Sequence, residues 1–285
     1  MLPKRNSVQQ FQSGARQLKM DLGATNYSRI AVFGGVYNNY LALQALVNEI
    51  PRHNVDALFC LGDLGAFGPH PNRVLPLLVE NKIQVVQGNY DNSIGNDLDD
   101  CQCGYTDPRD NYFAQISYDY TNTHTSREFK NYQKKLPPEI RFIAHGKRVL
   151  LCHGSPRRTN EFLWESTTPT QFLEKVFQDR QADVVLATHT GIKWQRKLSD
   201  DKLFANVGVI GRPENDGKTN VWFSIVHFLP ELRVEFIPLE YDFQRLAKEM
   251  KEEKLPEEFI QTTLTGWWTT CLEILPGKER ARGKF

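Results

Sequence analysis

The sequence predicts an α/β fold in which two packed mixed sheets are flanked by helices, and three observations support this. Short apolar runs alternate with helical stripes between residues 29 and 86, which is typical of strands joined by helices in a parallel sheet. A second group of apolar runs lies after residue 140, with one amphipathic helix among them. Polar residues suited to metal binding follow several of these runs, at the sheet edge where α/β proteins gather ligands.

The apolar runs and stripes give the expected elements in order along the chain. Strands are expected at 30–33, 57–61, 83–86, 141–144, 148–152, 184–187, 203–207, 220–228 and 233–238. Helices are expected at 40–50, 71–80 and 169–181. The stretch 241–271 predicts two further helices, broken at Leu255-Pro256, because proline ends a helix at the preceding residues.

These elements divide the chain into three parts. Residues 1–28 are expected to be a flexible N-terminal extension; their basic, acid-poor composition is also compatible with an organelle transit segment. Residues 29–240 form the main domain, with a polar and aromatic insertion at 92–135 that we interpret as lid-like, with some helix near 126–134. Residues 241–285 form the C-terminal helices and a basic tail.

Composition limits where the protein acts and what it contacts. A formal net charge of +1 gives no global field, so no nucleic-acid partner is expected. No apolar stretch approaches the ~18 residues of a membrane span. The odd number of scattered cysteines suits a reducing compartment better than a disulfide framework. We therefore expect a cytoplasmic protein.

Four short segments at predicted strand ends carry residues that can bind a metal. They are Gly62-Asp63-Leu64-Gly65, Gly88-Asn89-Tyr90-Asp91, His153-Gly154-Ser155-Pro156 and Thr188-His189-Thr190-Gly191. In this order and context the chain resembles the calcineurin-like metallophosphoesterase superfamily, and the resemblance covers about residues 29–266. The C-terminal stretch resembles the extension of bacterial phosphoesterases similar to serine/threonine protein phosphatases. The resemblance implies a four-layer αββα metallophosphoesterase sandwich.

The resemblance also implies a metal site with one complete and one degenerate subsite. The ligands of the complete subsite would be Asp63, Asn89, His153 and His189. In the other subsite the family's ligand positions hold Gly35, Tyr37 and Gly191, so only the shared Asp63 remains. Two imidazoles, a carboxylate and an amide oxygen suit one divalent transition metal, Mn²⁺, Zn²⁺ or Fe²⁺. The alternative is that these four residues only hold loops through hydrogen bonds and bind no metal.

The segment around Asn89 offers the catalytic candidates, Tyr90 and Asp91. Tyr90 stands where the family has a histidine credited with protonating the leaving group. A phenol has an ordinary pKa near 10, so at neutral pH it is a poor proton shuttle. Loss of a general acid typically costs about 10²–10⁴-fold in rate.

Two further groups of residues are weaker candidates. Four cations near the last two segments could occupy the vacated subsite or clamp a phosphate, or could be solvated surface charges. They are Arg157, Arg158, Lys193 and Arg196. The Cys101-Gln102-Cys103 sequence could bind metal or act as a redox pair, although its spacing is shorter than that of zinc sites.

The functional expectation is a metallophosphoesterase-family protein that retains one metal subsite and has weak or absent phosphoester hydrolysis. If it is active, it would be a metal-dependent phosphomonoesterase or phosphodiesterase. The alternative is a pseudoenzyme, a catalytically inactive binding or regulatory protein on the same scaffold. Its ligand would be a phosphate-containing small molecule, a phosphoprotein or another protein partner.

Overall fold

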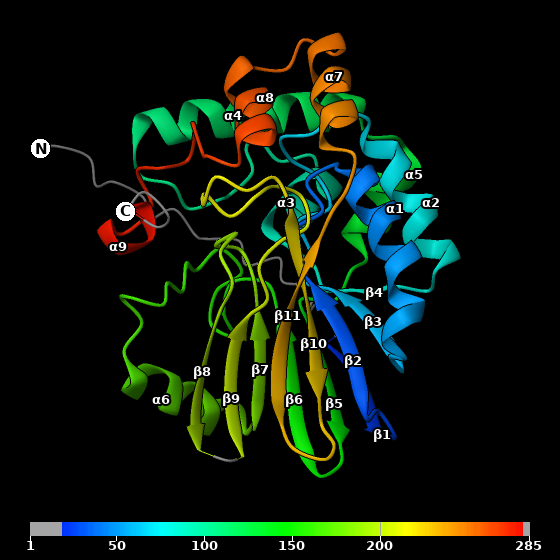
Figure 1. The fold of residues 1–285 in the computed structure, drawn as a ribbon, viewed down its shortest axis with the longest axis vertical. Helices are drawn as coiled ribbons and strands as arrows, with labels where there is room; N and C mark the ends of the chain where they lie inside the picture. The colour runs from blue at the N-terminus through cyan, green and yellow to red at the C-terminus, as the bar shows by residue number, and fades with distance from the viewer. Residues whose placement is uncertain (1–18, 200, 282–285) are drawn as a thin grey trace, which may run out of the picture.

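A computed structural model describes residues 19–199 and 201–281 and shows two mixed sheets packed face to face, with helices outside them (Figure 1). One sheet has the order β1-β5-β6-β7-β9-β8. Its strands are β1 (Met20–Thr25), β5 (Glu139–Ala144), β6 (Lys147–Cys152), β7 (Val184–Ala187), β8 (Trp194–Ser199) and β9 (Lys202–Asn206). The other has the order β11-β10-β2-β3-β4. Its strands are β2 (Arg29–Phe33), β3 (Ala57–Cys60), β4 (Gln84–Val85), β10 (Val221–His227) and β11 (Arg233–Leu239). The predicted architecture is confirmed.

The layers follow from strands that are apolar on both faces. In β2, Ile30 and Val32 point into the core between the sheets, where they meet the apolar side chains of β5, β6 and β7. Ala31 and Phe33 point the other way and pack against α1 (Tyr40–Glu49) and α2 (Val74–Glu80). On the outside of the other sheet, α6 (Thr170–Arg180) packs against apolar side chains of β6, β7 and β9. Short 3₁₀ turns, Ile50–His53 and Pro71–Arg73, adjoin α1 and α2.

Strand direction brings several chain segments to one edge. Strands β2, β3 and β4 are parallel to one another, and so are β6, β7 and β9. Because parallel strands end at the same edge of a sheet, the loops after β3, β6 and β7 are gathered together. In Figure 1 this edge faces the helices α4 (Pro108–His124), α7 (Phe243–Glu252) and α8 (Glu257–Thr265).

The structure differs from the sequence expectation at both the N-terminal extension and the insertion. Met20–Thr25 forms β1, which pairs in parallel with β5, whereas residues 1–18 lie outside the described residues. The insertion contains the helix expected near 126–134, here α5 (Arg127–Lys134), and also the longer α4, which was not predicted. A further helix, α3 (Asn89–Gly95), begins at one of the motif segments.

The C-terminal part has the two expected helices, α7 and α8, and a short third, α9 (Gly277–Arg280). Phe259 of α8 packs edge-on against Phe113 of α4, at a ring-centroid distance of 6.1 Å. Of the basic tail, residues 282–285 lie outside the described residues. No helix in the described part of the chain is long and apolar enough to cross a membrane.

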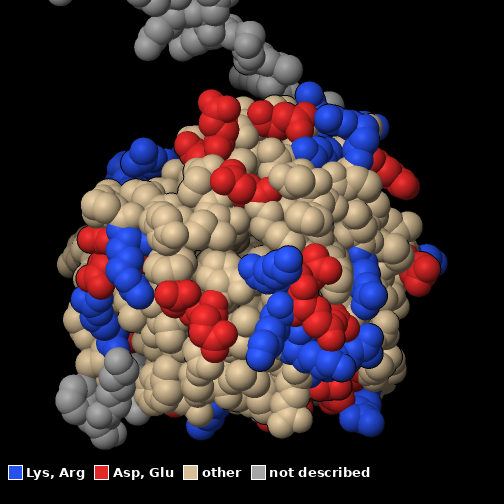
Figure 2. Space-filling view, turned by 90° about the horizontal axis from the view of Figure 1, so that it is seen from above, with Lys and Arg blue, Asp and Glu red and all other residues tan. Residues whose placement is uncertain are grey.

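The face formed by these helices carries acidic and basic side chains side by side (Figure 2). Several of them are ion pairs, such as Arg245 with Glu249 at 2.9 Å and Lys248 with Glu252 at 3.8 Å. This interspersed pattern accords with the near-zero net charge.

An ion-pair cluster fastens α5 to the end of α3 and gives a pH-dependent contribution to stability. Asp97 accepts hydrogen bonds from Lys130 at 2.7 Å and Arg127 at 2.8 Å, which lower its pKa to about 2. The folded-state pKa therefore lies below the unfolded value near 4, so this contribution is present above about pH 4 and is lost as pH falls towards 2. Because Asp97 is 44% exposed, we expect under about 1 kcal/mol. Thermal unfolding of Asp97→Asn and the wild type should differ at neutral pH and converge in acid; a difference independent of pH would contradict this.

Candidate metal centre

Three side chains that could bind a metal converge where strands of the two sheets end. Asp63 follows β3, His153 follows β6 and His189 follows β7. Each offers a donor atom, and these atoms all lie within 4.8 Å of one another. All three residues are at least 92% buried. Among the described residues they form the one cluster of three or more carboxylate, histidine or cysteine groups with metal-binding spacing.

A backbone carbonyl fixes the orientation of His153. Its Nδ1 lies 2.6 Å from the Leu61 carbonyl oxygen, which can only accept, so Nδ1 carries a proton and Nε2 faces the cluster. Nε2 lies 3.2 Å from Asp63 Oδ2 and 3.1 Å from His189 Nδ1. An outer carbonyl that holds a histidine in one tautomer is the usual support of a metal ligand.

The three side chains of the cluster have different pKa shifts, which set the charge of each one. Burial and the neighbouring His153 lower the pKa of His189 to about 3, so its imidazole is neutral at physiological pH. Burial opposes ionisation of Asp63, but the two histidines outweigh it and lower the pKa of the carboxyl. Burial likewise opposes protonation of His153, and Asp63 outweighs it and raises the pKa of that imidazole. A carboxylate and a neutral imidazole are thus already in their ligand forms.

Asn89, the fourth predicted ligand, lies at the start of α3 beside this cluster. Its Nδ2 donates to the Cys101 carbonyl at 2.9 Å, while its Oδ1 is buried and has no hydrogen-bond partner among the described residues. His189 Nε2 is also buried without a partner there. Unpaired buried polar atoms are costly, so each of these two atoms has bonding capacity that a ligand could use. Asp63, His153 and His189 fit a bound transition metal, whereas Asn89 as a fourth ligand stays a prediction.

Asp91 is buried next to the metal-binding cluster and holds the loops that carry Asp63 and Asn89 through hydrogen bonds. Its carboxylate accepts hydrogen bonds from the backbone amides of Asp63 at 2.8 Å, Leu64 at 3.0 Å and Gly88 at 2.8 Å, and from Gln133 Nε2 at 3.1 Å. Burial and the nearby Asp63 raise its pKa to about 6. These contacts make Asp91 the residue that joins two ligand-bearing segments, and its catalytic role stays a prediction.

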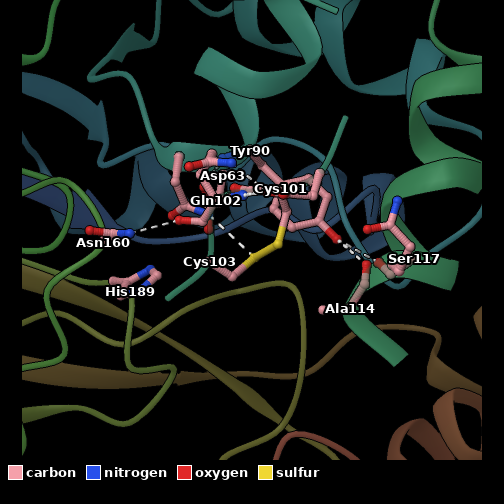
Figure 3. The surroundings of a disulfide bond; sticks show 12 residues. Asp63, Tyr90, Cys101, Gln102, Cys103, Ala114, Ser117, Asn160 and His189 are labelled. Carbon is pink, nitrogen blue, oxygen red and sulfur yellow. Dashed lines mark hydrogen bonds between the residues drawn. A yellow bond between two sulfur atoms is a disulfide. The ribbon is translucent and has the colours of Figure 1, made fainter. Parts of the chain in front are cut away.

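Tyr90, the other predicted catalytic residue, points away from the cluster. Its hydroxyl donates to Ser117 Oγ of α4 at 2.9 Å (Figure 3). Its ring packs against that of Tyr118. Burial raises the pKa of the phenol well above its ordinary value. The structure therefore uses Tyr90 to fasten α3 to α4.

Aromatic rings fill the space next to the positions of the missing ligands. A Cβ on Gly35 would lie 2.3 Å from the Tyr37 ring, and one on Gly191 would lie 3.1 Å from the Trp268 ring. Tyr37 in turn packs edge-on against Phe67, with a ring-centroid distance of 5.4 Å. Aromatic side chains thus pack against two of the positions where the resemblance places the second subsite.

Three of the four predicted cations have partners elsewhere, and the fourth, Arg158, is exposed. Arg157 pairs with Glu161 and lies over the Phe172 ring, and Arg158 is exposed on the same loop. Lys193 pairs with Glu214 at 2.6 Å. Arg196 donates to the Thr168 carbonyl at 2.6 Å. None of the hydrogen bonds or ion pairs described for these side chains involves the metal-binding cluster.

Arg212, a buried cation that packs between aromatic rings, was not singled out in the sequence. It is 93% buried, and its guanidinium lies 3.7 Å from the Trp268 ring centroid and 4.8 Å from that of Phe67. It also donates to the Thr270 carbonyl at 3.3 Å, while its Nε has no partner among the described residues. Its place depends on the C-terminal residues Trp268 and Thr270, which are too distant in the sequence to predict.

Cys101 and Cys103 form a disulfide beside the site (Figure 3), and a redox role for this pair stays a prediction. The other cysteines, Cys60, Cys152 and Cys271, are free and buried. A disulfide was not expected from the odd, scattered cysteines of the chain.

This fold and an Asp/His/His cluster at the strand ends define a calcineurin-like phosphoesterase. Residues 29–227 match the calcineurin-like phosphoesterase superfamily domain, and the chain belongs to that superfamily. Among its relatives is the uncharacterized protein MJ0912 of Methanocaldococcus jannaschii, which is 25% identical over 244 residues, covering 81% of this chain and 95% of that protein.

Two solved structures show the same fold. The hypothetical protein PH1004 of Pyrococcus horikoshii has a TM-score of 0.71 at 21% identity, covering 85% of this chain and 99% of its own. A metallophosphoesterase from Sphaerobacter thermophilus has a TM-score of 0.64 at 23% identity, covering 85% of this chain and 100% of its own.

Proposed function

We propose that the protein binds one divalent transition metal through Asp63, Asn89, His153 and His189 and has weak or absent phosphoester hydrolysis. The observation that carries the proposal is the pairing of a preformed ligand cluster with an aromatic-filled second subsite. Asp63 supplies negative charge, His153 is oriented by Leu61, and Asn89 and His189 each have a buried atom left for an ion to satisfy. Mn²⁺, Zn²⁺ and Fe²⁺ suit these donors.

Two features argue for weak hydrolysis. A two-metal phosphoesterase uses both cations to stabilise the attacking and leaving oxygens, and here Tyr37 and Trp268 stand against two of the positions that would hold the second. The leaving-group acid of the family is replaced by Tyr90, whose hydroxyl is bonded to Ser117. A bound metal would supply Lewis acidity and an activated water, while Asp91 and Leu61 would keep the ligands in place.

The second candidate is a binding or regulatory protein that recognises a phosphate compound or a protein partner. It is favoured by the burial of the ligands, since Asp63, Asn89, His153 and His189 are at most 8% exposed. A substrate would reach these groups only after neighbouring loops move.

Metal analysis tests the proposal. Purified tag-free protein is expected to hold about one transition metal per chain. His153→Ala should lose it, because the variant lacks the ligand that Leu61 orients, and Asn89→Ala should bind it more weakly. The matched control is His145→Ala, which removes an exposed histidine and should leave metal content unchanged.

Hydrolysis of an aryl phosphodiester in Mn²⁺ supplies the second measurement. We expect little turnover above background, because the loss of the general acid alone is worth about 10²–10⁴-fold. Two metals per chain together with rapid turnover would contradict weak hydrolysis, whereas absence of metal from the wild type would contradict the metal site and favour the binding protein.

A further inference from the structure

The loop between α3 and α4 lies directly on the candidate metal centre (Figure 3). Within this loop Cys101 and Cys103 are joined by a disulfide that encloses the single residue Gln102. Cys103 Sγ lies 3.4 Å from Asn89 Nδ2, and the backbone of Cys103 faces the His189 ring. The disulfide is thus in contact with Asn89, and the backbone of the same loop is in contact with His189.

The loop determines which end of the Asn89 amide faces the site. The Cys101 carbonyl can only accept a hydrogen bond, so the group 2.9 Å from it must be the amide nitrogen of Asn89. The oxygen, Oδ1, consequently points elsewhere and is the atom left without a partner. The Cys101 carbonyl therefore fixes which atom of the Asn89 amide is left without a partner.

A second set of contacts fastens the loop to the segment after His153. Asn160 Nδ2 donates to the Gln102 carbonyl at 2.9 Å. Tyr105 packs against Phe162 at a ring-centroid distance of 5.7 Å, and Phe162 packs against His189 at 4.2 Å. The loop thus bridges the Asn89 side and the histidine side of the site. Gln102 and Gly104 are exposed, so the bridge lies at the protein surface.

We propose that the Cys101–Cys103 disulfide is a redox-controlled positioning element for the metal ligand Asn89. In the oxidised protein the closed loop holds the Asn89 amide by its nitrogen, which leaves the oxygen for the metal, and keeps the Cys103 backbone against His189. Reduction frees the loop, loosens Asn89 and weakens metal binding. The inference rests on the proposed function, because it requires a metal held at Asp63, Asn89, His153 and His189.

The redox step needs a thiol reductant, which the proposal names as its co-reactant. Two thiols transfer two electrons and two protons: the bond between the cysteine sulfurs breaks, each sulfur becomes a thiol, and the reductant leaves as its own disulfide. In the laboratory a water-soluble phosphine does the same: the phosphine gives two electrons to the disulfide and becomes its oxide, and water supplies the oxygen atom and the two protons.

Co²⁺ binding, followed by its absorption, compares the two redox states of the full-length protein. Outer partners of metal ligands typically change affinity by about 10–100-fold, so we expect phosphine reduction to weaken Co²⁺ binding by that factor. The double variant Cys101→Ser/Cys103→Ser should bind weakly with and without phosphine. Asn160→Ala, which loosens the loop and keeps both cysteines, should give an intermediate affinity.

Asn89→Ala supplies the readout that separates positioning from general stability. If the disulfide acts through Asn89, reduction should leave the weaker Co²⁺ affinity of this variant unchanged, whereas a general loosening of the fold would weaken it again. Equal affinity in both redox states of the wild type would overturn the inference and leave the proposed function standing. Tighter binding on reduction, with sulfur-to-cobalt charge-transfer absorption, would overturn it by making a cysteine a direct ligand. No Co²⁺ binding in either state would overturn the proposed function itself.

Discussion

Asp91→Ala is expected to lower the free energy of unfolding by more than about 3 kcal/mol, or to prevent folding. The substitution leaves three buried backbone amides and the Gln133 side chain without their acceptor, and each unsatisfied buried group costs about 1–3 kcal/mol. The carboxylate joins the segment after β3 to the segment that begins α3, so its loss should separate Asp63 from Asn89. Urea unfolding followed by circular dichroism measures the change.

Asp99→Ala is the matched control for this prediction, because Asp99 is exposed and close in the sequence. It should stay within about 0.5 kcal/mol of the wild type. A variant at Asp91 as stable as this control would show that the four hydrogen bonds are replaceable, and would return Asp91 to consideration as a catalytic residue.

Gly35→Ala is expected to destabilise the protein by about 1–3 kcal/mol or more, because its Cβ would lie 2.3 Å from the Tyr37 ring. Removing that ring should remove the conflict. In the double variant with Tyr37→Ala, the added cost of the Gly35 change should fall close to zero, although Tyr37→Ala alone costs about 3–5 kcal/mol. The four unfolding free energies form a double-mutant cycle.

The control for the cycle is Gly277→Ala, where a Cβ would meet nothing within 4 Å. It is expected to be neutral or slightly stabilising. Strict additivity of the Gly35 and Tyr37 changes would mean that the ring moves aside freely, and the vacated subsite would then still be available for a cation.

The elements that could be predicted from the sequence were those with a short, continuous run of apolar residues or a clear helix-breaking residue. Strands such as β2 and β7 are continuous apolar runs, and Pro256 marks the break between α7 and α8. By contrast β1, with the sequence MDLGAT, is largely exposed, and it forms a strand because it pairs with β5. The helix α4 is polar overall, and its Asp107 cap and Pro108 start were its clearest sequence features.

The residues of the candidate site also include some whose positions could be predicted from the sequence and some whose positions could not. Asp63, His153 and His189 follow strands, so their convergence at one edge could be expected from topology. The direction of Tyr90 depends on Ser117, which lies on a helix the sequence did not reveal. Arg157 pairs with Glu161, which lies only four residues further along the chain, so the local sequence does contain this partner. Lys193 pairs with Glu214, and nothing near Lys193 in the sequence indicates that carboxylate. Contacts between distant segments therefore decide the positions of Tyr90 and Lys193.

The aromatic packing at Gly35 and Gly191 also constrains how such a chain could change over evolutionary time. A histidine at position 191 would need to tolerate a backbone φ of +76° and to displace Trp268, and an aspartate at position 35 would strike Tyr37. Each single step back towards a second cation therefore passes through a less stable intermediate that has not yet gained a complete ligand set. A second cation-binding subsite would therefore require several substitutions at once, including changes to Tyr37 and Trp268, and single substitutions at positions 35 or 191 would only lower stability.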